Sequence, residues 1–87
     1  MSKKYEFTGK EINHFGRILK QIRRLSDGLV GGYIQSENNL SHNGDCFVYD
    51  NAKVFGKAKV SGNAQVYGNA LVSGNALVNG NAAATGI

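Results

Sequence analysis

Aliphatic and small residues recur with a six-residue period over the second half of the chain. An aliphatic residue occupies every sixth position from Val48 to Val78, and a small residue lies two positions before each of them. Side chains of an extended strand alternate between two faces, so these two residues point to one side and the residue between them points to the other. Glycine follows each aliphatic residue by two from Val54 onwards, where it can turn the chain sharply. The pattern predicts short strands and corners that bury the valines by stacking coil on coil as a parallel solenoid.

The same pattern begins earlier in a looser form. Ile34 and Leu40 are six residues apart, but the next aliphatic residue, Val48, comes eight residues after Leu40. Two residues are therefore inserted around positions 41–44, and Cys46 takes the inward slot that alanine fills elsewhere. Counted this way, the core aliphatic residues number nine: Ile34, Leu40, Val48, Val54, Val60, Val66, Val72, Val78 and Ala84.

The N-terminal segment gives a less decisive pattern. Residues 5–8 alternate between apolar and polar, as in a half-buried strand, and residues 13–16 favour a turn. Residues 17–25 fit a helix with Ile18, Ile22 and Leu25 on one face, and they also fit a strand. The residues alone favour the helix slightly.

The spacing of the repeat resembles that of known β-helix proteins. Val60 and Ala64, like Val66 and Ala70, place a small residue four positions after an aliphatic one. This spacing is similar to the hexapeptide repeat of left-handed parallel β-helix proteins. The outward residues do not distinguish coils of twelve residues from coils of eighteen. The resemblance implies left-handed coils of three units, or eighteen residues, each, which groups the nine core aliphatic residues into about three coils.

A second resemblance involves the middle segment, namely Gly31-Gly32-Tyr33-Ile34, Asn39-Leu40-Ser41 and residues 44–52. It is similar to the opening of YdcK-like hexapeptide proteins of bacteria, phages and prophages, and the similarity covers residues 17–82. It implies extended β structure before the two glycines, so we expect residues 4–25 to form a β-hairpin cap. The expected fold is all-β: a short, single-stranded, left-handed parallel β-helix with an N-terminal β-hairpin cap. Residues 1–30 form the basic cap and residues 31–87 the solenoid, together one compact domain.

Charge distinguishes the two regions. Residues 1–30 contain seven basic and three acidic residues, a balance of +4, and the remaining residues balance to zero. A basic segment can attract nucleic acid or an acidic protein, although a solvated face is the more ordinary interpretation. The sequence contains no membrane-length apolar run and no secretory h-region, which predicts a cytoplasmic protein, in the host cell if a phage encodes it.

Few residues suggest catalysis or ligand binding. Some hexapeptide-repeat acyltransferases use a histidine base, and His42 beside Asp45 is the one candidate pair. The only other histidine is His14, and a zinc site of the three-histidine kind needs one more. Gly31-Gly32 is too short for a phosphate-binding loop and favours a turn. We expect no catalytic residue, no metal and no cofactor.

Candidate binding residues lie on the outward positions. Leu71 and Leu77 replace the polar residues of earlier units and predict an oligomer contact. An aromatic and basic patch is expected from Lys53, Phe55, Lys57, Lys59 and Tyr67, and a basic surface on the cap from Arg17, Lys20, Arg23 and Arg24. Stacking of nucleic-acid bases on this patch is less favoured than the ordinary role of corner aromatic residues, which is to cover the edge of a coil.

These observations favour a non-enzymatic phage or bacterial solenoid that works by protein binding or self-association, as a structural or adaptor module. The alternative is a small phage-encoded inhibitor, of the anti-CRISPR type, that docks on a host defence complex. A reduced acyltransferase is a distant third.

Overall fold

A computed structural model describes residues 3–86 of the chain as β-strands, with one short 3-10 helix. In chain order the elements are β1 (Tyr5–His14), β2 (Arg17–Arg24), β3 (Val30–Ile34), η1 (Glu37–Asn39), β4 (Phe47–Val48), β5 (Lys53–Val54), β6 (Lys59–Val60), β7 (Gln65–Gly68), β8 (Leu71–Val72), β9 (Leu77–Val78) and β10 (Ala83–Gly86). The all-β prediction is confirmed.

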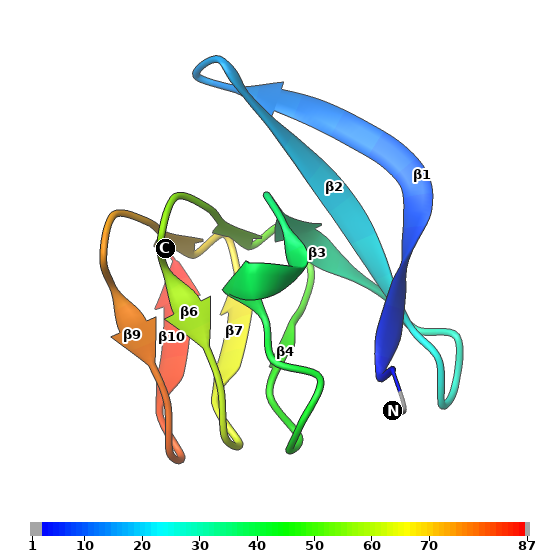
Figure 1. Cartoon of the computed structure of the whole chain (residues 1–87), viewed down its shortest axis with the longest axis vertical. Helices are drawn as coiled ribbons and strands as arrows, with labels where there is room; N and C mark the ends of the chain where they lie inside the picture. The colour runs from blue at the N-terminus through cyan, green and yellow to red at the C-terminus, as the bar shows by residue number, and fades with distance from the viewer. Residues whose placement is uncertain (1–2, 87) are drawn as a thin grey trace.

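From β3 onwards the chain visits three sheets in turn and returns to each (Figure 1). The sheet orders are β1-β2-β3-β5-β8, β10-β7-β4 and β6-β9, and from β3 to β10 neighbouring strands are parallel. Val48 pairs with Val66 and Val60 with Val78, so the chain returns to each sheet after eighteen residues. Each hexapeptide therefore forms one strand and one corner, and three of them make a circuit.

The first circuit is longer than the others. Ile34 pairs with Val54, and Leu40 bridges to Val60, each twenty residues ahead. The difference of two residues matches the insertion expected at positions 41–44. A surface loop absorbs the insertion, and the inward positions keep their register.

The core consists of the inward-facing residues of the repeat. The small and aliphatic positions from Ile34 to Val72 are at most 6% exposed, whereas Val78 and Ala84 are only partly buried. Cys46 is fully buried in an alanine slot, as the sequence predicts. The period-two alternation thus decides which side chains of the repeat enter the core after Val48. In the first coil, Tyr33 and Phe47 are buried as well, although they occupy the alternate positions.

The N-terminal segment is the expected β-hairpin. β1 and β2 pair antiparallel around a turn at Phe15 and Gly16, which have φ angles of 52° and 85°. β2 also pairs with β3, so its backbone is bonded on both sides. The slight preference for a helix over residues 17–25 was wrong, because pairing on two sides outweighs a weak local propensity.

The two glycines before Tyr33 form part of β3 and not a turn, which corrects the sequence interpretation. Neither has a positive φ. A Cβ atom on Gly31 would lie 2.4 Å from the Val48 carbonyl oxygen. Glycine is required here because neighbouring backbone approaches too closely for any side chain.

The start of β1 covers the N-terminal end of the core. Tyr5 is 1% exposed, and its hydroxyl donates a 2.6 Å hydrogen bond to the carbonyl of Leu40. Ile22 of β2 packs in the same core, and Phe7 lies partly buried against it. The hairpin therefore caps one end of the solenoid, as expected.

Candidate functional site

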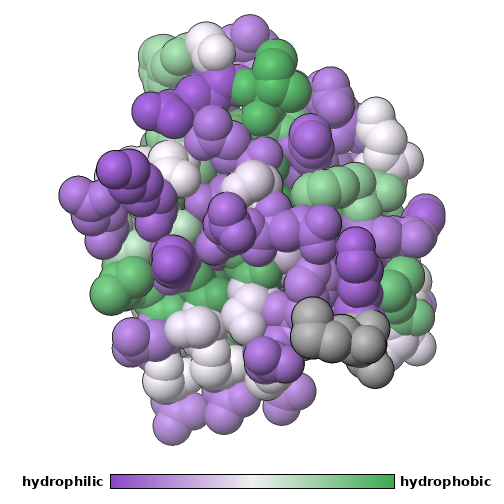
Figure 2. All heavy atoms as spheres, viewed as in Figure 1, coloured by the Kyte–Doolittle hydropathy of each residue, from purple (hydrophilic) through white to green (hydrophobic). Residues whose placement is uncertain are grey.

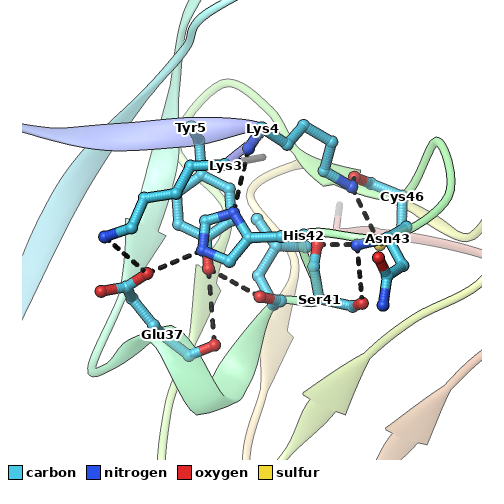
Figure 3. A network of polar contacts seen from close by, with 9 residues as sticks. Lys3, Lys4, Tyr5, Glu37, Ser41, His42, Asn43 and Cys46 are labelled. Carbon is cyan, nitrogen blue, oxygen red and sulfur yellow. Dashed lines mark hydrogen bonds and ion pairs between the residues drawn. The ribbon is translucent and has the colours of Figure 1, made fainter. Parts of the chain in front are cut away.

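A group of polar side chains gathers where the start of β1 meets the inserted loop (Figure 3). We call this group the cap–loop network, which comprises Lys3, Lys4, Tyr5, Glu37, Ser41, His42, Asn43 and Cys46. Its members come from two regions nearly forty residues apart, which the cap brings together.

Both ring nitrogens of His42 are engaged within the network. Nδ1 accepts a 3.0 Å hydrogen bond from the Lys4 amide, so the neutral ring carries its proton on Nε2, which lies 2.7 Å from the Glu37 carboxylate. The ring also stacks on Tyr5 with centroids 4.0 Å apart. The acidic partner of His42 is thus Glu37, and not the Asp45 that the sequence suggested. With both nitrogens occupied, the ring offers no free base to a substrate.

Cys46 and Lys4 are also engaged in internal contacts. The Lys4 ammonium donates hydrogen bonds to the carbonyls of Gly44 and Cys46, and it lies 3.3 Å from the Cys46 sulfur. The thiol is fully buried and 3.5 Å from the Ser41 carbonyl. A buried thiol of this kind cannot reach a substrate, so these contacts hold the inserted loop against β1.

The pKa values in the network follow from these contacts. The hydrogen bond from His42, followed by the attraction of Lys3, whose ammonium is 3.6 Å away, lowers the pKa of Glu37. Burial, with a smaller contribution from Glu37, raises the pKa of the Tyr5 hydroxyl well above its usual range. Tyr5 therefore stays a neutral hydrogen-bond donor at physiological pH.

Stability in acid is expected to depend on Glu37. Because its pKa is lower in the folded chain than in the unfolded chain, its contribution is present above the ordinary glutamate pKa of about 4.3 and is lost as the pH falls through the lowered value. The melting temperatures of the wild type and Glu37→Gln should be measured from pH 7 to pH 2. The wild type should melt at the higher temperature near pH 7, and the difference should shrink below about pH 4.3. A difference in melting temperature that stays constant over this pH range would contradict a lowered pKa of Glu37 as its cause.

The basic residues of the hairpin mostly contact their own chain. Arg23 forms an ion pair with Glu6, and Arg24 pairs with Asp27 at 2.7 Å. The hydrogen bond from Arg24 lowers the pKa of Asp27 to about 2. The Lys20 ammonium lies 5.2 Å from the centre of the Phe7 ring. All four cations proposed for binding, Arg17 included, thus have intramolecular partners that a ligand would have to displace.

Phe55 lies against the tip of the hairpin. The guanidinium of Arg17 is 5.7 Å from its ring centre, and the His14 ring packs edge-on at 5.3 Å. Arg17 also donates a 3.2 Å hydrogen bond to Gln35. Phe55 is only partly exposed, so it holds the hairpin to the solenoid as well as lining the surface.

Lys57 and Lys59 are the more accessible basic residues of the solenoid. Both are exposed and line a shallow hollow of about 420 Å³ beside η1, and Lys57 also borders a second hollow of about 500 Å³ next to Arg17. Within residues 3–86, neither lysine forms an ion pair. These two lysines and Arg17 form what we call the basic corner.

The remaining residues of the expected aromatic and basic patch are dispersed. Lys53 lies on β5, 5.8 Å above the Tyr33 ring, whereas Lys59 is on β6 and Tyr67 on β7, each in a different sheet. The structure therefore divides this set among three sheets. The face of the molecule in Figure 2 likewise shows hydrophobic side chains interrupted by hydrophilic ones.

Leu71 and Leu77 are exposed, by 56% and 67%, as expected for outward positions. They belong to β8 and β9, which lie in different sheets, so they flank one corner of the chain's C-terminal coil. Leu71 stands next to Lys53 and Leu77 next to Lys59 in the register of their sheets.

One structurally important polar residue did not stand out in the sequence. Asn39 is 1% exposed and is hydrogen-bonded on both sides of its amide. Its one signal is positional, because asparagine stands where the later repeats place an outward Lys59 or Leu77. Glu37 and Lys4 gave no such signal, since their roles arise from contacts distant in sequence.

Two further observations concern possible sites and membranes. Among residues 3–86, no group of three or more His, Cys, Asp or Glu side chains gathers as a metal site would require. No helix in this part of the chain has the length and apolar character needed to cross a membrane.

Comparison with known proteins identifies the repeat. Residues 58–72 and 64–78 each match the YdcK beta solenoid repeat, and the two matches are offset by six residues, the period of the chain. There is no significant match among curated proteins or among solved structures. The pairing of strands every eighteen residues agrees with a solenoid of such units. Residues 58–78 of this chain therefore match the YdcK type of β-solenoid repeat.

Proposed function

We propose that this protein is a non-enzymatic β-solenoid of phage or bacterial origin that works by binding protein, in the first place a further copy of itself. Its coils, about three in number, are left-handed, as the resemblance to hexapeptide-repeat proteins implies. The engagement of both His42 nitrogens supports a role without catalysis.

The observation that carries this proposal is a change in outward residues along the solenoid. On two sheets a lysine is followed, one coil later, by a leucine: Lys53 by Leu71, and Lys59 by Leu77. Long apolar side chains that are more than half exposed favour a contact when they flank one corner of a coil, as these two do. Self-association would bury them.

The proposal predicts a mass in solution above the 9.3 kDa of one chain. The double substitution Leu71→Lys and Leu77→Lys should lower that mass, because it places charges at the contact. Light scattering after size-exclusion chromatography measures the change, and Lys10→Leu is the control for altered surface hydrophobicity away from these residues. A mass that the double substitution leaves unchanged would contradict a contact at the leucines.

A second candidate function is supported by the basic corner. Lys57 and Lys59 form no ion pair within the described residues and, with Arg17, border two hollows. An acidic surface on a host defence complex would complement such a corner. A wild-type chain that stays monomeric at high concentration would favour this inhibitor role over self-association.

A further inference from the structure

The turn of the cap hairpin carries a bulky side chain where the backbone disfavours one. His14 pairs with Arg17, so Phe15 and Gly16 form a two-residue loop, and both have a positive φ, of 52° and 85°. Such loops usually contain asparagine followed by glycine, because a bulky side chain is strained at positive φ. Burial does not compensate for this strain, since Phe15 is 93% exposed. Strain of this kind is typical of functional positions. We call residues 14–17 the hairpin tip.

Contacts within the chain hold the ring of Phe15 in place. The side-chain oxygen of Asn13 accepts a 3.0 Å hydrogen bond from the amide of Gly16. The His14 ring packs edge-on against Phe15 at 4.6 Å and against Phe55 of the solenoid at 5.3 Å. Figure 1 shows this turn projecting beyond the coils of the solenoid. The ring is therefore both accessible and fixed, so little conformational entropy is lost when a ligand binds it.

The cations of the basic corner lie next to the hairpin tip. Arg17, the last residue of the tip, borders the same hollow as Lys57. Lys57 and Lys59 line the other hollow, and neither forms an ion pair within residues 3–86. None of the described residues that line these two hollows is acidic, and the sequence contains no Asp or Glu from position 12 to position 26. The surface beside Phe15 is therefore positive and favours an anionic ligand.

An exposed ring beside unpaired cations has the chemistry that recognises single-stranded nucleic acid. Bases stack on aromatic rings with little regard to sequence, and lysine side chains bind the phosphates between them. A duplex would first have to be unstacked to admit the ring, and that cost is comparable with the gain from one stacked base. An acidic protein surface would use the cations but not the ring. The combination therefore favours a strand whose bases are already unpaired.

We propose that the hairpin tip and the basic corner bind single-stranded nucleic acid, with a base stacked on Phe15 and phosphates bound by Lys57 and Lys59. This inference goes beyond the protein binding proposed above and does not depend on self-association. Arg17 adds positive charge and, through its contact with Phe55, holds the tip against the solenoid. Two phosphate contacts with a single strand should give a slope of about −1.4 when the logarithm of the binding constant is plotted against that of the salt concentration.

A fluorescent variant of the full chain tests the stacking directly. The sequence contains no tryptophan, so Phe15→Trp places a single tryptophan at the hairpin tip. Oligothymidylate and oligouridylate are the probes, because DNA and RNA strands offer the same stacking and phosphate chemistry. Either strand should quench the tryptophan emission, and the one that binds more tightly identifies the preferred nucleic acid. No quenching by either strand at low salt would overturn the proposal.

Two further ligands test the choice of a single strand. A DNA duplex of the same length and polyglutamate both carry dense negative charge, but neither offers unpaired bases. Both should bind the protein more weakly than the single strands do. Tighter binding of the duplex, or of polyglutamate, would overturn the proposal in favour of a wedge in paired DNA or of an acidic protein, respectively.

Substitutions separate stacking from charge. Phe15→Asn removes the ring but keeps a residue that tolerates positive φ, so the melting temperature should not fall, and the affinity for oligothymidylate should fall about tenfold. Leu25→Asn, which removes an exposed apolar side chain just beyond the other end of β2, is the matched control and should bind as the wild type does. Lys57→Gln should reduce the salt slope by about 0.7. A Phe15→Asn variant that binds as tightly as the wild type would show that charge alone attracts the strand, which would overturn the proposed site.

Discussion

Gly32→Ala is expected to lower the free energy of unfolding by about 3 kcal/mol, at the upper end of what overpacking a core costs. A Cβ atom at this position would lie 2.5 Å from the carbonyl oxygen of Ala52 and 2.8 Å from a methyl group of Val48. The carbonyl cannot move away freely, because it accepts a 2.9 Å hydrogen bond from the amide of Tyr33. Alanine therefore has to separate β3 from the next coil, which weakens the first contact between coils. Urea unfolding followed by circular dichroism measures the loss.

Gly74→Ala is the matched control for this substitution. Nothing lies within 4 Å of a Cβ atom there, but the φ of +67° makes a side chain unfavourable. The control should therefore cost about 1 kcal/mol, from backbone strain alone. If Gly32→Ala costs no more than Gly74→Ala, the close approach of the two coils is not what requires glycine in β3.

Asn39→Ala is expected to cost about 2–4 kcal/mol, because it removes four hydrogen bonds of a buried side chain, one of them to the buried carbonyl of Ala58. The side-chain oxygen of Asn39 accepts hydrogen bonds from the amides of Gln35 and Ser36, at 3.0 and 2.9 Å. Its amide nitrogen donates to the carbonyls of Gly56 and Ala58, at 3.3 and 2.8 Å. One side chain thus ties the corner before η1 to the next coil, and its loss should be visible in urea unfolding.

Two further variants make the test specific. Asn38→Ala changes the exposed neighbour and should alter stability by no more than about 0.5 kcal/mol. Asn39→Asp keeps the acceptor but replaces the donor with an oxygen facing two carbonyl groups, so it should be destabilising as well. An aspartate variant as stable as the wild type would show that the bonds to Gly56 and Ala58 contribute nothing.

The local sequence pattern was sufficient to predict the strands of the solenoid, but it was not sufficient to predict the second strand of the cap. Residues 17–25 fit a helical face containing Ile18, Ile22 and Leu25, yet only Ile22 is buried. Their conformation depends on β1 and β3, whose backbone groups are provided by other segments. The resemblance to YdcK-like proteins gave the correct strand, because it carries information about those neighbours.

The proposed surface residues show the same dependence. Arg23 and Arg24 appear in the sequence as free cations, but Glu6 and Asp27 pair with them once the hairpin forms. Phe55 appears as an outward aromatic residue, yet the hairpin tip brings Arg17 and His14 against it. Outward position alone does not show whether a side chain is available to a partner.

By itself the sequence determined the short strands, the corners between them and the residues of the repeat that point into the core. It could do so because a strict six-residue period fixes both the turn positions and the alternation of side chains, and both are local properties. Only the tertiary structure decided that the hairpin closes one end of the solenoid and that His42 is paired with Glu37. These features arise from contacts between distant residues, such as Lys4 and His42, which are 38 positions apart, and such pairings leave no periodic trace in the sequence.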